Sequence, residues 1–226
     1  MEKAKEDYLK TIYGSEQASS ELKPSLLAEL LGVSKAAVTD MLKKLDKLGF
    51  IQYQSYRPIA LTEKGRKAGA LVTRRHRLWE LFLHEKLGFD WAEVHDEAER
   101  LEHASSDRLM NKIDESLGFP KSDPHGSPIP NHLGELEDTV SYVPLSSLAI
   151  LETGIVRRVR SMNPEFLQFL KTHQICLGAR VTVLRKQSFD GSVVVKVEDQ
   201  ELTLSDIVSN SIWLEKDLNE GKGFRK

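Results

Sequence analysis

The sequence has very little cysteine: Cys176 is the single one among 226 residues. One cysteine excludes an intramolecular disulfide framework and is typical of a protein that works in a reducing compartment. We therefore expect a cytoplasmic location. Because Ile175 and Leu177 flank Cys176, we also expect this thiol to pack inside a core.

Long apolar runs are also lacking. No stretch approaches the roughly 20 apolar residues that a membrane-spanning helix needs, and the first residues, MEKAKEDYLK, have no apolar core of the kind found in secretory signals. We therefore expect no membrane partner. With 40% hydrophobic and 29% charged residues and a mean hydropathy of -0.37, the chain has the composition of a globular protein with two or three domains.

The formal net charge of -2 gives no global sign of a nucleic-acid partner, but the charges are unevenly distributed. From Lys35 to Arg75 there are ten lysines and arginines against three acidic residues. From His76 to Gly118 there are five against eleven. A basic segment attracts phosphate and an acidic segment attracts cations. The two halves of this region therefore point to different ligands.

The acidic segment contains a stretch, residues 91–117, with the pattern of one long helix. Four side chains that bind metals well share one stripe of that helix, about 100° wide: His95, Glu99, Glu102 and His103. A second pair, His76 and Glu80, lies one turn apart on the preceding helical pattern. Together these groups predict a site for one or two divalent cations. The alternative is a set of solvated helix charges, which often have this spacing.

The first third of the chain has the pattern of a winged helix-turn-helix. Helical patterns cover residues 3–15, 24–31 and 35–48, and extended runs at 50–53 and 59–61 flank the turn QSYRP. Gly32 ends the second helix, and Ser34 is placed to cap the third. A helical hairpin that packs for its own sake is the alternative, because this signal is only moderately specific.

The outward side chains of the third helix are small or hydrogen-bonding, as a surface entering the major groove requires. Together with an arginine at the tip of the wing, they give the candidate DNA-contacting residues: Ser34, Lys35, Ala36, Ala37, Thr39, Lys43 and Arg57. Thr39 and Lys43 have side chains that can bind base edges or phosphates.

The remaining patterns predict a long helix, a loop and a β domain. The helical pattern of residues 64–87 carries a surplus of apolar residues near Trp79–Phe89, which favours pairing with a second copy of the chain. Residues 119–134 contain four prolines and two glycines and predict a loop. After residue 139, short alternating strands and a helix capped by Asn163 predict a small β-barrel.

The order of these motifs resembles the metal-dependent repressors of the diphtheria-toxin-repressor and manganese-transport-regulator family. The motifs are a winged helix followed by RRHRLWELFL, VHDEAERLEH, DPHGSPIP and a small β domain, over residues 3 to about 215. The resemblance implies a mainly α fold with a small β domain. Its three domains would be a winged helix-turn-helix at 1–72, a helical metal-binding and dimerisation domain at 73–138 and an SH3-like β-barrel at 139–226.

The resemblance also implies a function and its site residues. The protein would be a homodimer that binds operator DNA when loaded with metal, with no enzymatic activity and no small-molecule substrate. Its primary metal site would be Asp7, Glu99, Glu102 and His103, with Asp123 standing where other members place a further ligand from a loop. Its second site would be His76, Glu80 and His95. Members with the β domain complete that second site from the domain, and Glu165 is the nearest candidate here.

Two departures from the family pattern bear on the metal. Asp7 and Glu99 stand where iron-responsive members have methionine and cysteine, so the primary site offers hard oxygens that suit Mn(II), with Fe(II) as the alternative. Lys10 replaces an acid that some manganese-specific members carry, which argues against a closely bridged two-manganese site. A rival interpretation is a dinuclear metalloenzyme, a hydrolase or oxidase, although the chain shows no distinct nucleophile.

Overall fold

The computed structural model describes residues 2–54, 57–137, 141–161 and 163–217. The chain divides into two compact units. Unit 1 comprises Met1–Phe82, Asp96–Lys121 and Ile129–Glu137, and unit 2 comprises Leu83–His95, Ser122–Pro128 and Asp138–Lys226. No helix in the described part of the chain is both long enough and apolar enough to cross a membrane.

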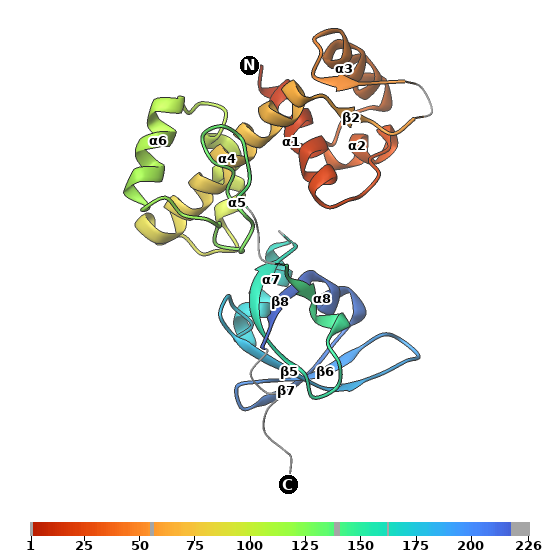
Figure 1. The fold of residues 1–226 in the computed structure, drawn as a ribbon, viewed down its shortest axis with the longest axis vertical. Helices are drawn as coiled ribbons and strands as arrows, with labels where there is room; N and C mark the ends of the chain where they lie inside the picture. The colour runs from red at the N-terminus through yellow and green to blue at the C-terminus, as the bar shows by residue number, and fades with distance from the viewer. Residues whose placement is uncertain (1, 55–56, 138–140, 162, 218–226) are drawn as a thin grey trace. The chain divides into compact units, whose positions relative to one another are not determined.

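Unit 1 begins with the predicted winged helix-turn-helix (Figure 1). Its elements are α1 (Lys3–Gln17), α2 (Pro24–Leu30), α3 (Lys35–Lys47), β1 (Ile51–Gln52) and β2 (Ala60–Leu61). The two strands pair antiparallel, with Ile51 opposite Leu61, and form the stem of the wing. Residues 55 and 56 of the expected wing turn lie outside the described residues.

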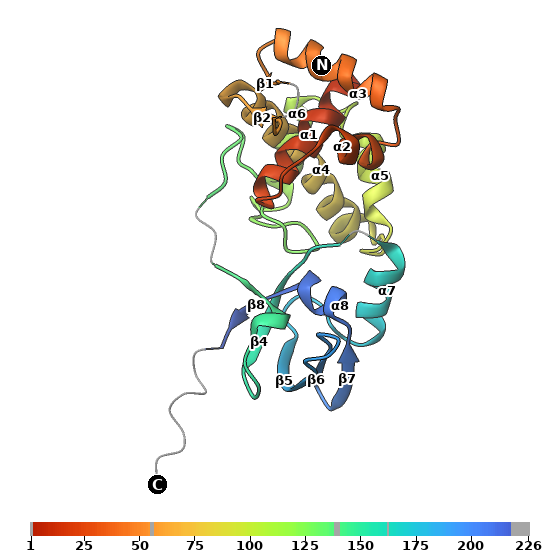
Figure 2. The same cartoon turned by 90° about the vertical axis from the view of Figure 1, so that its right-hand side faces the viewer.

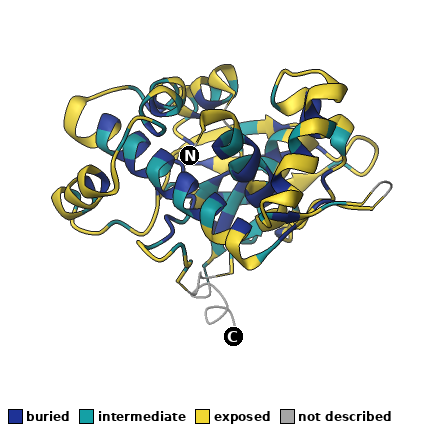
Figure 3. Cartoon of the chain, turned by 90° about the horizontal axis from the view of Figure 1, so that it is seen from above, coloured by how far each residue is buried: buried dark blue, intermediate teal, exposed yellow. Residues whose placement is uncertain are grey.

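The third helix is built as its sequence predicted. The Ser34 side chain caps α3 by accepting a hydrogen bond from the backbone N–H of Ala37 at 3.2 Å. Val38, Leu42 and Leu45 are buried in a core shared with α1 and α2, and each such side chain contributes about 1.5–3 kcal/mol. Figures 1 and 2 show α3 at the outer edge of this part of the fold, and Figure 3 shows helices of the chain that carry both buried and exposed residues.

The stretch expected to form one helix over residues 91–117 forms two, so that expectation was wrong. After α4 (Glu63–Leu87), the chain forms α5 (Val94–Leu101) and α6 (Asp107–Ser116). The break has a local cause, because the Ser106 side chain caps α6 by accepting a hydrogen bond from the N–H of Leu109 at 3.2 Å. Glu102 and His103 therefore stand in the turn just after α5.

Unit 2 holds a six-stranded antiparallel sheet in the order β3-β8-β4-β5-β6-β7 (Figure 1). Its elements are β3 (Val143–Pro144), the short 3-10 helix η1 (Leu145–Ser147), β4 (Thr153–Val159), α7 (Pro164–Thr172), β5 (Arg180–Lys186), β6 (Val193–Val197), β7 (Gln200–Leu204), α8 (Asp206–Ser211) and β8 (Ile212–Lys216). The sheet is open, so the expected closed SH3-like barrel was wrong in this respect. The edge strand β3 has only two residues. It therefore offers few backbone groups for the hydrogen bonds to the opposite edge that would close a barrel.

The core of unit 2 follows the strand periodicity. Alternate residues such as Val181 and Val183 on β5 are fully buried, and Asn163 caps α7 as expected, accepting from the N–H of Phe166 at 3.0 Å. Cys176 departs from expectation, because it is exposed rather than buried. Its apolar neighbour Ile175 takes the core position instead.

Candidate metal centre

Four predicted ligands come together inside unit 1. Asp7 lies on α1, Glu99 lies in the last turn of α5, and Glu102 and His103 follow that helix directly. Each offers one ligand atom, and these four atoms lie within 4.8 Å of one another. We call Asp7, Glu99, Glu102 and His103 the four-residue group. Because that span is about twice a metal–ligand bond of roughly 2.0–2.2 Å, a single ion can contact all four.

The contacts of His103 Nε2 fit a cation better than they fit hydrogen bonds. Its Nε2 lies 2.8 Å from Asp7 Oδ1 and 3.0 Å from Glu102 Oε1. Nevertheless, Nε2 and Asp7 Oδ1 are buried and neither makes a well-directed hydrogen bond among the described residues. Polar atoms buried in this way cost free energy unless something satisfies them. Three carboxylates and one imidazole suit a divalent ion of hard or borderline character.

The ammonium of Lys10 already partners this group. Lys10 lies one turn after Asp7 on α1, contacts Oε1 of Glu99, and is 2.8 Å from Oε1 of Glu102. Burial raises the pKa of Glu102, but the hydrogen bond to His76 and the charge of Lys10 outweigh it and hold that pKa below its usual range. Burial also raises the pKa of Asp7, and the charges of His103 and Lys10 offset this only in part.

A second pair of predicted ligands, His76 and Glu80, is buried on α4. His76 Nε2 lies 3.0 Å from Glu80 Oε1, and His76 Nδ1 lies 2.6 Å from Glu102 Oε2. Burial lowers the pKa of His76, but the two carboxylates raise it more, to about 9. Glu102 therefore connects the four-residue group to the His76–Glu80 pair, a link that the sequence did not predict.

We expect the His76 pair to make the stability of the metal-free protein depend on pH. The folded-state pKa of about 9 lies above the ordinary 6.5, so this stabilisation is complete below pH 6.5 and is lost as pH rises through 9. The loss should be on the order of 3 kcal/mol. Denaturant unfolding in chelator between pH 6 and 9.5 measures it. His76→Gln should flatten the pH dependence, whereas His132→Gln, at an exposed loop position, should leave it unchanged. A wild-type free energy of unfolding that stays constant over this range would contradict the pairing.

Two further predicted ligands belong to unit 2. His95 is the second residue of α5. The buried Asp123 has its Oδ1 accepting hydrogen bonds from the backbone N–H of His125 at 2.8 Å and of Ser127 at 2.9 Å. Gly126 holds this loop against β4, because a Cβ there would lie 1.9 Å from the Arg157 carbonyl oxygen. Asp123 is not part of the group formed by Asp7, Glu99, Glu102 and His103. The roles of His95 and Asp123 as ligands stay predictions.

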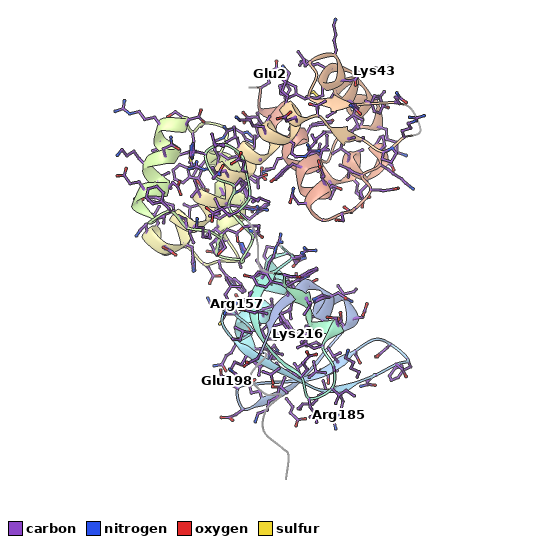
Figure 4. The ribbon with its side chains drawn as sticks, in the orientation of Figure 1. Glu2, Lys43, Arg157, Arg185, Glu198 and Lys216 are labelled. Atoms are coloured by element: carbon purple, nitrogen blue, oxygen red, sulfur yellow. The ribbon has the colours of Figure 1, made fainter. Side chains whose placement is uncertain are left out.

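The predicted DNA-contacting residues occupy an accessible surface. All except the half-buried Thr39 are exposed: Ser34, Lys35, Ala36, Ala37, Lys43 and Arg57. The Thr39 hydroxyl donates to the Lys35 carbonyl oxygen at 3.0 Å, so it is already bonded within α3. Figure 4 shows Lys43 on α3, and its neighbour Lys44 pairs with Glu2 at 3.1 Å.

Comparison with known proteins identifies the family. Residues 1–59 match the model for the iron dependent repressor, N-terminal DNA binding domain, residues 62–131 match the iron dependent repressor, metal binding and dimerisation domain, and residues 143–216 match the FeoA domain. The iron-dependent repressor IdeR of Mycobacterium tuberculosis is 30% identical over 225 residues, covering 93% of this chain and 96% of IdeR. The chain belongs to the iron-dependent repressor family.

Further relatives support the same family assignment. The diphtheria toxin repressor of Corynebacterium diphtheriae is 28% identical, with 93% of this chain and 96% of that protein covered. A solved manganese-dependent transcriptional repressor in complex with manganese has a TM-score of 0.88 and 36% identity, with 94% and 99% covered. ScaR with bound Zn2+ has a TM-score of 0.81 and 33% identity, with 94% and 99% covered. The protein is a metal-dependent transcriptional repressor, and the metalloenzyme interpretation finds no support in these relatives.

We expect Lys10 to compete with the metal in this repressor. Its ammonium sits against two carboxylates of the four-residue group and must leave them before a cation binds. Lys10→Gln should therefore tighten Mn(II) binding about tenfold. The effect is much smaller than the Coulomb attraction between the ammonium and the two carboxylates, because water solvates the ammonium once the metal displaces it. Calorimetric titration measures the change. Lys5→Gln, on the same helix and paired with Glu2 at 3.1 Å, is the control; unchanged or weaker binding by Lys10→Gln would disprove the competition.

Proposed function

We propose that this repressor binds operator DNA when Asp7, Glu99, Glu102 and His103 hold one Mn(II) ion. The observation that carries the proposal is the convergence of three carboxylates and one imidazole within 4.8 Å. A bound ion supplies the positive charge that keeps these carboxylates together. Asp7 comes from α1, and the other three come from α5 and the turn after it, so loading ties the first helix to the metal-binding helices.

The choice of Mn(II) rests on ligand chemistry. Oxygen ligands suit Mn(II), and the group contains no sulfur. Fe(II) is the alternative. Affinity alone would favour later metals such as zinc, so the choice among metals in the cell depends on geometry and availability.

We propose a second site made by His76 and Glu80 with His95. Asp123 stays a proposed further ligand of the first site, not of this one. The support is the buried His76–Glu80 pair, with 3.0 Å between the ring and the carboxylate. Glu165 lies in the first turn of α7 and is exposed, so its carboxylate is accessible to a metal. Such a site would stabilise the loaded repressor rather than replace the four-residue group.

The regulatory step is a change in how α1 is held. Because α1 packs in the same core as α2 and α3, a change in the position of α1 moves the DNA-contacting helix. A preference of about 1–3 kcal/mol of the metal for the DNA-binding arrangement is enough for a usable switch.

The partners would be operator DNA and a second copy of the chain. Lys35, Lys43 and Arg57 are exposed cations that would contact phosphates, while Thr39 lies among the small residues of α3 near base edges. The exposed Leu109 of α6 belongs to the metal-binding and dimerisation region. A dimer would place two recognition helices about 34 Å apart and would read a palindromic site.

The experiment is a metal-dependent pulldown of genomic fragments followed by gel shifts. We expect shifts with Mn(II) that disappear in chelator and that weaken steeply as salt rises, because several lysines and arginines release counterions from DNA. Lys43→Gln should weaken binding and lower the salt slope by about 1; Lys121→Gln, at a surface pair with Glu137, should change neither. Equal shifts in chelator would remove the metal switch from the proposal.

A further inference from the structure

A further buried carboxylate, that of Glu6, lies beside the four-residue group. Glu6 on α1 is 6% exposed. Its Oε2 lies 2.7 Å from Nδ1 of His103, and its Oε1 lies 2.9 Å from Nη2 of Arg75 on α4. Glu6 thus joins three separate parts of unit 1: the first helix, the long helix and the turn after α5.

The contact with Glu6 decides which nitrogen of His103 faces the ligand group. A carboxylate only accepts hydrogen bonds, so Nδ1 must donate its N–H to Glu6. Nε2 is then left to face Asp7 Oδ1 and Glu102 Oε1, at 2.8 and 3.0 Å. Glu6 and Asp7 are consecutive residues of α1, so one segment of this helix holds both edges of the imidazole ring.

We propose that Glu6 is a positioning residue for the metal site, which fixes the His103 ring with Nε2 toward the ion. A carboxylate on the far nitrogen of a ligating histidine sets the ring orientation and raises its basicity as a ligand. Arg75 keeps the Glu6 carboxylate in place from α4, so the same contact couples metal loading to the docking of α1 on α4. This inference rests on the proposed function of the four-residue group.

A purely structural role predicts a different result. If Glu6 served only to pair with Arg75, removing its charge would leave a buried guanidinium with a weaker partner, since the nearest other carboxylate is the exposed Asp107 at 3.9 Å. Stability would fall, but the metal affinity of the folded protein would not change. The two roles therefore separate when metal affinity and unfolding are measured on the same variant.

The test is calorimetric titration of Mn(II) into the full-length protein, without DNA, for wild type, Glu6→Gln and Glu16→Gln. Glu16 is the matched control, because it lies on the same helix and pairs with an arginine, Arg66, at 2.7 Å. We expect Glu6→Gln to weaken Mn(II) binding about 10- to 100-fold, the usual effect of removing such a partner, and Glu16→Gln to change it by less than about twofold.

Nitrogen-15 NMR of the wild-type protein loaded with Zn(II), a diamagnetic probe, gives a second measurement that does not depend on how a variant folds. We expect His103 to keep a proton on Nδ1 and to bind through Nε2. Binding through Nδ1, or a Glu6→Gln variant that binds Mn(II) as tightly as wild type, would overturn the role of Glu6 alone. A wild-type protein that binds no Mn(II) would instead remove the proposed function, and this inference with it.

Discussion

Glu102→Gln is expected to lower the Mn(II) affinity of the four-residue group on the order of 100-fold. Glu102 is completely buried and contacts Lys10, His76 and His103 at 2.8, 2.6 and 3.0 Å. An amide has nearly the same shape but lacks the negative charge that a divalent ion requires of its ligand. Among the four predicted ligands of the group, Glu102 is the one that is fully buried, and it also contacts His76.

The effect on affinity must be separated from an effect on folding. Lys10 and His76 each keep one other carboxylate, from Glu99 and Glu80 respectively, when Glu102 is neutral. We therefore expect the variant to fold, which its thermal unfolding in chelator checks. Glu97→Gln is the control, since Glu97 lies on α5 and pairs with Arg100 at 2.8 Å at the surface. Calorimetric titration measures all three proteins, and equal affinities for Glu102→Gln and wild type would show that Glu102 is not a ligand.

Replacing Asp7 by Met together with Glu99 by Cys is expected to exchange the metal preference. The double variant places a thioether and a thiolate at positions that now offer carboxylate oxygens within 4.8 Å of His103. Soft ligands lower the response to Mn(II) relative to Co(II) and Fe(II). We expect the ratio of Mn(II) to Co(II) midpoints in DNA binding to shift on the order of tenfold or more.

The single variant Glu99→Ala separates preference from affinity. It removes one ligand without adding a soft one, so it should weaken the response to every metal in similar proportion. DNA-binding curves recorded anaerobically with Mn(II), Fe(II) and Co(II) compare wild type with both variants. If Glu99→Ala left the Mn(II) midpoint unchanged, Glu99 would be a helix charge that pairs with Lys10 and would not be a ligand.

Local signals in the sequence predicted most of the helical elements. Ser34 and Asn163 cap helices where serine and asparagine side chains accept backbone N–H bonds. Pro24 and Pro164 stand at the first positions of α2 and α7. These effects act within three or four residues, so they can be read without knowing the rest of the fold. Ser106, a residue type that caps helices, also indicated the start of α6. The apolar periodicity of a helix continues on both sides of it, so the sequence was interpreted as one helix.

Long-range pairing could not be read from the sequence. Whether a sheet closes into a barrel depends on which edge strands meet, and strand periodicity says nothing about that. The partners of Glu6 and Lys10 lie about ninety residues away, at His103, Glu99 and Glu102. Charges on α1 could equally have been solvated. Cys176 shows the same limit, because apolar neighbours do not decide which residue of a short loop faces the core.

The four residues of this group were predicted as ligands from the family resemblance and, except for Asp7, from helix periodicity. The assumed helix ended early, yet the group still converges. Glu99 lies in the last turn of α5, and Glu102 and His103 follow in the turn after it, which keeps the three side chains together. Asp7 had no local signal and depended wholly on the resemblance. Its contact with His103 at 2.8 Å is a result of tertiary packing.

The most direct measurement combines metal binding and DNA binding in one titration. A fluorescent genomic fragment recovered by Mn(II)-dependent pulldown is mixed with wild type or Glu102→Gln, and its anisotropy is followed as Mn(II) increases. We expect DNA binding by wild type to rise with Mn(II) and to reverse in chelator. The midpoint for Glu102→Gln should shift by the same factor as its Mn(II) affinity measured without DNA. DNA binding in chelator equal to that in Mn(II), or coincident curves for the two proteins despite weakened metal binding by the variant, would contradict control of this repressor through the four-residue group.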